Sequence, residues 1–150
     1  MAEADPHVIE VLNGLLTGAY DSADGFRKAA GLARNPEFQT LFAERAKARD
    51  GLAGEIEAEV RAFGGAPAQE GSLLAGAHRA FTQVRDLIAQ GSDRAVVEEV
   101  ARGEAFIQLK FDEAVADAQL PQQARAMAER ASQALKAEHA EIVGLRDQFR

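Results

Sequence analysis

The sequence contains no cysteine, and this absence removes several chemistries at once. Without cysteine the chain forms no disulfide, offers no thiolate to a metal ion and has no cysteine nucleophile. Basic residues are also in the minority: 17 against 24 acidic ones give a net charge of −7, which argues against a nucleic-acid-binding surface. No apolar run approaches the about 20 residues that a membrane-spanning helix needs, so we expect no membrane partner.

Signals for β-strands and for several catalytic classes are missing too. No segment alternates β-branched and polar residues with period two, so we predict no strand. The phosphate-binding patterns G-x-G-x-x-G and G-K-[ST] are absent, and no serine lies in a nucleophile elbow. The stretch from Met1 to Asp5 carries acidic residues and no apolar run. We therefore expect no signal peptide and a cytoplasmic location.

Proline and glycine divide the chain into helical segments. With 150 residues, 47% hydrophobic and 27% charged, residues 1–150 are expected to form a single globular domain. Asp5-Pro6 and Asn35-Pro36 each place a capping side chain before a proline at the first helical position. Glycines suited to a helix end occur at Gly31, Gly64-Gly65 and Gly91. These signals predict five helical segments, at residues 6–31, 36–63, 73–90, 93–118 and 121–149.

The apolar residues of every segment recur at alternating steps of three and four, so each helix has one face to bury. Four segments have about 26–29 residues, or about 40 Å at the helical rise, and the segment 73–90 is shorter. This layout predicts an all-α, ferritin-like up-down four-helix bundle. The segment 73–90 would be a helical crossover between the second and third long helices.

Several motifs are typical of one protein family. They are the stretch from Tyr20 to Ala30, Gly64-Gly65-Ala66-Pro67, Gly76-Ala77-His78-Arg79, Gly103-Glu104, and His139 with Leu145-Arg146-Asp147. On these motifs the chain resembles, over nearly its whole length, a bacterial family of small ferritin-like four-helix-bundle proteins of unassigned function, distantly similar to rubrerythrins and ferritins. The resemblance implies the bundle and assigns no reaction.

A ferritin-like bundle raises the question of a di-iron or di-manganese centre. Such a centre takes a Glu from each of two helices and a Glu-x-x-His pair from each of the other two. None of the three histidines, His7, His78 and His139, has a glutamate three positions before it. The standard ligand set is therefore missing.

Polar residues nevertheless interrupt the apolar stripes at similar heights along the predicted helices. Residue counting places one group within about one helical turn in mid-bundle. This predicted polar layer consists of Arg45, Arg49, Glu104, Glu138 and His139. A second layer, further along the bundle, would hold Asn13, Glu55, His78 or Arg79, and Asp112.

Two interpretations bring the residues of the first layer together, beside a third in which their charges only reach the surface along the helix flanks. Arginine only donates hydrogen bonds and keeps its proton, so Arg45 and Arg49 would form a charge-balanced salt-bridge layer with the glutamates, and we favour this reading. In the other interpretation iron or manganese is bound, and the ligands are Glu55, Glu104, Glu138 and His139. The choice depends on whether Arg49 or Glu55 faces the interior, which the periodicity of the segment leaves open.

One face of the first helix carries Gly14, Gly18, Asp21 and Gly25, opposite its apolar seam. Each exposed glycine costs about 1 kcal/mol of helix stability, so we interpret this stripe as a close-approach surface for another helix or for the second subunit of a dimer. The sequence favours a non-catalytic protein with a binding or stress-related role and no cofactor. The alternatives are an iron- or manganese-dependent oxidoreductase or iron-handling protein with an atypical ligand set, and an apolar small-molecule pocket beside the alanine-rich last helix.

Overall fold

The computed structural model describes residues 5–69 and 92–149, which form four long helices and contain no strand. The helices are α1 (Pro6–Leu32), α2 (Pro36–Ala62), α4 (Asp93–Val115) and α5 (Gln122–Asp147). The predicted all-α four-helix bundle is confirmed. The crossover helix predicted at 73–90 lies outside the described residues, as does the predicted stop at Gly91.

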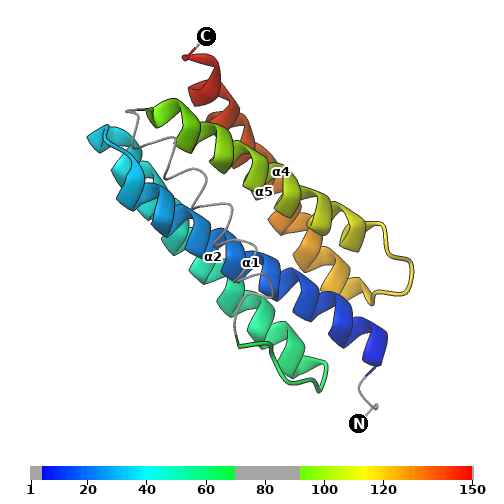
Figure 1. Ribbon diagram of the computed structural model, residues 1–150. Coiled ribbons are helices and arrows are strands. Elements are labelled where there is room, and N and C mark those ends of the chain that lie inside the picture. The colour runs from blue at the N-terminus through cyan, green and yellow to red at the C-terminus, as the bar shows by residue number, and fades with distance from the viewer. Residues whose placement is uncertain (1–4, 70–91, 150) are drawn as a thin grey trace.

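The bundle consists of two antiparallel hairpins, α1 with α2 and α4 with α5, that pack together mainly through α1 and α4 (Figure 1). α2 and α4 run in the same direction. Their N-terminal ends are joined by Asp93, whose carboxylate accepts the backbone N–H groups of Arg34 and Asn35 at 2.8 and 2.9 Å. None of the helices in the described part of the chain is long and apolar enough to cross a membrane.

Three helices begin at capping side chains, including the two predicted before a proline, Asp5 and Asn35. The caps are Asp5, Asn35 and Ser92, which accept the backbone N–H groups of His7, Glu37 and Ala95 at 2.9, 2.9 and 3.2 Å. Each bond satisfies one of the donors that a helix N-terminus leaves without a partner. α5 begins directly after Pro121 and has no side-chain cap.

The helix ends agree less well with the predictions. α2 is followed by Gly64 in the left-handed region, at φ 87°, as expected for a glycine after a helix. α1, however, continues through Gly31 to Leu32, and the N–H of Ala33 bonds to Ala29. A glycine in the last turn costs only about 1 kcal/mol, so it does not by itself end a helix. α4 ends at Val115, three residues before the predicted 118.

Two apolar clusters fill the bundle, one toward each end. One cluster contains Leu12, Leu16, Ile56, Ile107 and Phe111 among its fully buried members. The other contains Phe26, Phe42, Val96, Val97 and Ile142. In every helix the change from one cluster to the other occurs at a polar residue, so the core is divided by a polar level in mid-bundle.

Candidate functional site

The polar level takes one residue from each described helix. Its members are Ser22 of α1, Arg49 of α2, Glu104 of α4 and Glu138 of α5, and we call these four the polar layer. Each occupies the position in its helix where an apolar residue would continue the buried stripe. The layer therefore forms because the buried stripe of each of the four helices contains a polar residue at the same height along the bundle.

Arg49 is the centre of the polar layer. Its Nη1 donates to Glu104 Oε1 at 2.6 Å and to Ser22 Oγ at 2.7 Å. Its Nη2 donates to Glu104 Oε2 at 2.8 Å and also to Glu138 Oε2. The side chains of Arg49 and Glu104 are each 2% exposed, whereas 21% of the Glu138 side chain is exposed. Both terminal nitrogens of the guanidinium thus donate hydrogen bonds to carboxylates.

The surroundings keep Arg49 charged despite its burial. Burial acts to lower the pKa of Arg49, but hydrogen bonds and negative charge from Glu104 and Glu138 outweigh it, and the pKa is raised. The Phe26 ring lies 5.1 Å from the guanidinium carbon, which adds a cation–π contact. Both carboxylates consequently face a permanent cation.

Arg45 and His139 differ from the other predicted members of this layer. Arg45 lies at its rim, where Nη1 is 3.8 Å from Glu138 Oε1 and Nη2 donates to Glu141. Within the described chain His139 makes no hydrogen bond to the layer. Neighbouring residues on a helix point about 100° apart, so turning Glu138 inward turns His139 away. Ser22 is a member that the residue counting did not predict, although its hydroxyl interrupts the apolar stripe of α1.

The second predicted layer is not assembled as expected. Asn13 binds the segment after α2: its Nδ2 donates to Ala66 O at 3.1 Å, and its Oδ1 accepts the Ala68 N–H at 2.8 Å. Glu55 is exposed. Residue counting gives the height of a residue along the bundle but not the side on which it lies, and this is why the prediction was wrong. His78 and Arg79 lie outside the described residues.

Asp112, the remaining member of that group, belongs to a separate cluster between α4 and α5. Its Oδ1 accepts hydrogen bonds from Ser132 Oγ at 2.7 Å and from Gln108 Nε2 at 2.9 Å. Both hydrogen bonds lower the pKa of Asp112, and the one from Ser132 has the larger effect. The contact between Gln108 and Ser132 was not predicted, because it depends on the spacing of two helices that sequence periodicity does not give.

Of the residues proposed to bind iron or manganese, Glu104 and Glu138 meet at Arg49, whereas Glu55 is exposed and lies apart from them. Arg49, rather than Glu55, faces the interior, which answers the question left open by the periodicity. Glu104 and Glu138 both bind Arg49, and a guanidinium at this position repels a divalent cation. No group of three or more acidic or histidine side chains within residues 5–69 and 92–149 is arranged to hold a metal ion. The donor set present does not fit a di-metal centre.

A groove of about 480 Å³ separates α2 from α5 directly over the polar layer. Its walls are small and apolar, and its lining includes Ala48, Gly51, Leu52, Ala131, Ala134 and Leu135. Arg49 and Glu138 lie at its base, and the exposed side chains of Glu55 and Arg130 line it as well. The alanines of α5 thus leave open space beside the bundle core.

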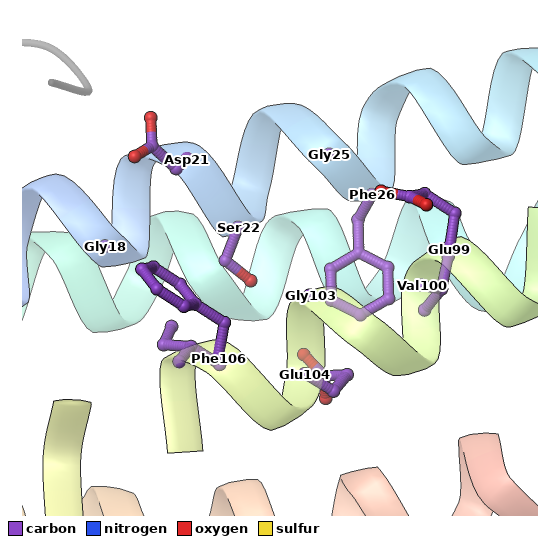
Figure 2. Close-up of a pocket in the computed structure, with 11 residues that line it drawn as sticks. Gly18, Asp21, Ser22, Gly25, Phe26, Glu99, Val100, Gly103, Glu104 and Phe106 are labelled. Atoms are coloured by element: carbon purple, nitrogen blue, oxygen red, sulfur yellow. The ribbon is translucent and has the colours of Figure 1, made fainter. Parts of the chain in front are cut away.

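The glycine stripe of α1 borders a second, smaller hollow. Gly18 and Gly25 line it together with Asp21, and Gly103 and Phe106 of α4 lie opposite (Figure 2). Burial, and after it the charge of Asp24, raises the pKa of Asp21. A Cβ atom added at Gly18 would lie 3.4 Å from Cδ of Lys110, so at this point α4 is the approaching helix. At Gly14 nothing lies within 4 Å of such an atom.

The comparison with known proteins identifies a family but no reaction. Residues 7–117 match a domain of unknown function, DUF2383. The matched range contains Ser22, Arg49 and Glu104 of the polar layer, while Glu138 lies beyond it. No curated protein matches the chain. Because the match covers most of the sequence, the chain belongs to the DUF2383 family.

Proposed function

We propose that this protein is a non-catalytic binding protein on a ferritin-like bundle, with the polar layer in the place of a di-metal centre. One observation carries the proposal: Arg49 forms hydrogen bonds with both Glu104 and Glu138. These glutamates project from two different helices toward the bundle axis, as the carboxylate ligands of di-metal bundles do. Here a protonated guanidinium supplies the positive charge that metal ions supply in such a centre.

The polar layer has a structural role in this proposal. Arg49 connects α2 to α1 through Ser22, to α4 through Glu104 and to α5 through Glu138. Removing one member of a buried ion pair leaves an uncompensated charge and costs about 3–5 kcal/mol, so the pairing selects one alignment of the two hairpins. The same contacts determine the separation of α2 and α5, and with it the width of the groove between them.

The groove between α2 and α5 is the binding site that we propose. Its volume of about 480 Å³ lies within the about 300–1,000 Å³ typical of small-molecule sites. Small apolar walls with a charged base suit an amphipathic ligand, whose apolar part would contact Ala131 and Ala134 and whose polar group would lie near Arg49 or Arg130. No reaction is required of such a site.

Metal content distinguishes this proposal from an iron- or manganese-dependent oxidoreductase. The protein is produced in medium supplemented with both metals, purified without chelator and analysed by plasma mass spectrometry. We expect far less than one metal ion per chain, and an unchanged helical signal after treatment with chelator. Near-stoichiometric iron or manganese that is lost in Glu104→Gln, but kept in the control Glu129→Gln on the exposed face of α5, would overturn the proposal.

The groove itself is tested with the amphipathic dye ANS as the probe. We expect saturable binding to the folded protein, weakened in Ala134→Phe because the new ring fills the groove. Ala140→Phe adds the same ring to α5 at an exposed position outside the groove and should bind the dye as the wild type does. Equal dye binding by all three proteins, or none by the wild type, would contradict a ligand site in this groove.

A further inference from the structure

The outer face of α4 carries the large apolar side chains that the described chain leaves exposed. They are Phe106, 52% exposed, and Leu109, 56% exposed. Arg102 lies one turn before them and Glu113 one turn after them, and both are exposed. Steps of four, three and four residues put Arg102, Phe106, Leu109 and Glu113 on one face of the helix. We call these four residues the α4 ridge.

The α4 ridge is complementary to its own reversed copy. Read along the helix, its members are basic, apolar, apolar and acidic. A two-fold axis between Phe106 and Leu109 places Arg102 against the partner's Glu113, and Phe106 against the partner's Leu109. Two-fold dimers are built from such self-complementary patches, and each contact occurs twice. We infer that the α4 ridge is the surface on which a second copy of this chain docks, with the two α4 helices antiparallel.

The two ends of the neighbouring α1 face carry the same charges as the ends of the ridge, and the acidic Asp21 lies between them. His7 bonds to Asp117 at 2.7 Å, and Gly18 lies beside Lys110, so the two helices are aligned in opposite directions. Glu10 therefore lies toward the Glu113 end of this face, and Lys28 toward the Arg102 end. The two-fold axis brings the acidic end of one copy over the basic end of the other.

The hollow beside Phe106 fits a protein partner better than a small molecule. Its volume is about 120 Å³, below the about 300 Å³ at which small-molecule sites begin. Three glycines, Gly18, Gly25 and Gly103, line it and leave the backbone accessible. A space of this size beside an exposed aromatic ring accommodates one apolar side chain from the facing surface.

The apolar centre of the ridge is expected to supply most of the binding energy. Arg102 also donates to Glu99 of its own helix, and exposed ion pairs contribute little to stability. The charges at the ends of the ridge select the antiparallel orientation, because a parallel arrangement would bring like charges together. This inference does not depend on the proposed function, since none of the ridge residues belongs to the polar layer.

Charge reversal tests the orientation directly. The dissociation constant of the dimer is measured by sedimentation equilibrium for the wild type, Glu113→Arg, and the double variant Arg102→Glu/Glu113→Arg. Glu113→Arg places two arginines together at both ends of the contact, and we expect the dissociation constant to rise about tenfold or more. The double variant restores unlike pairs and should return close to the wild-type value. Glu129→Arg, the same charge change at an exposed site on α5, should leave it unchanged.

Truncation tests the apolar centre. Phe106→Ala removes one exposed ring from each copy, and we expect the dissociation constant to rise about tenfold or more, with no loss of helical signal. A wild-type protein that remains monomeric at the highest concentration reached would overturn the inference. A dimer that is indifferent to Phe106→Ala, or a double variant as weak as Glu113→Arg, would also overturn it, because the contact would then lie on another face or in another orientation.

Discussion

Arg49 and Glu104 form a bidentate ion pair in the middle of the bundle, with nitrogen–oxygen distances of 2.6 and 2.8 Å and with 2% of each side chain exposed. The pair joins α2 of one hairpin to α4 of the other. Both charges are shielded from water, so removing either side chain would leave the other as an uncompensated buried charge. Glu138, by contrast, reaches the surface and also has Arg45 nearby, at 3.8 Å. Within the polar layer, the Arg49–Glu104 contact is therefore the one whose loss should destabilise the fold most.

Tyr20 offers a direct measure of one inter-helix contact. Burial, then the hydrogen bond to Glu57 and its negative charge, raise the pKa of Tyr20 to about 12. Tyr20 is the one tyrosine of a chain without tryptophan, so tyrosinate absorbance reports on it alone. We expect a midpoint near 12 in the folded protein and a lower one in Glu57→Gln. In urea it should return to the ordinary value of 10.0.

The same shift has a consequence for stability. Because the folded-state pKa of Tyr20 lies above the unfolded one, its contribution is complete below pH 10 and is lost as the pH rises toward 12. A midpoint near 10 in a protein that is still helical would show that the contact between Tyr20 and Glu57 is not formed.

Asp112 gives the opposite pH dependence. Its folded-state pKa is lowered from 3.8, chiefly by the hydrogen bonds from Ser132 and Gln108, so its contribution is present above pH 3.8 and is lost as the pH falls through the folded-state value. We expect Asp112→Asn to be less stable than the wild type at pH 7, and the difference to shrink as the pH falls below 3.8. Urea unfolding at a series of pH values measures it. A difference independent of pH would contradict this account.

Two glycines are expected to respond oppositely to alanine. A Cβ atom added at Gly65 would lie 2.6 Å from Ile9 Cδ1 and 2.8 Å from Cγ2, so we expect Gly65→Ala to cost about 1–3 kcal/mol. At Gly54, inside α2, nothing lies within 4 Å of such an atom, and Gly54→Ala should gain about 0.5–1 kcal/mol in helix propensity. The free energies of unfolding of the two variants and the wild type are compared by urea unfolding.

The crowding at Gly65 has its own control. Ile9→Val removes Cδ1, the nearest of the clashing atoms, so it should recover part of the loss when combined with Gly65→Ala. If Gly65→Ala does not lower the free energy of unfolding, the segment after α2 does not dock on α1 as described.

Helical periodicity accounts for most of what the sequence predicted correctly. The buried residues Phe42, Arg49 and Ile56 are spaced by seven, two turns apart on one face of α2, and this rotation excludes Glu55 from the interior. Phe42 and Ile56 are large and apolar, so they decide the rotation of the helix, and Arg49 follows. The stripe of α4 from Val97 to Ala114, with Glu104 inside it, is buried, which agrees with the expectation of one buried face per helix.

What the sequence could not supply is the position of each residue around the bundle. Asn13 and Asp112 have similar predicted heights, but Asn13 lies toward the segment after α2 and Asp112 toward α5. His139 was grouped with Glu138 by height alone, although the buried stripe of α5, with Leu135 and Ile142, continues at Glu138 and not at its neighbour. Such choices depend on the distances between helices, which are set by the packing of the whole bundle.

The measurement that tests the central claim most directly is a double-mutant cycle on Arg49 and Glu104. The free energy of unfolding is obtained in urea for the wild type, Arg49→Met, Glu104→Leu and the double variant. We expect each single substitution to cost about 3–5 kcal/mol, because it leaves one buried charge without a partner. The double variant, with an apolar pair of similar size, should cost much less than their sum. Single substitutions that cost nothing, or costs that simply add, would contradict the account of a buried ion pair at the centre of this bundle.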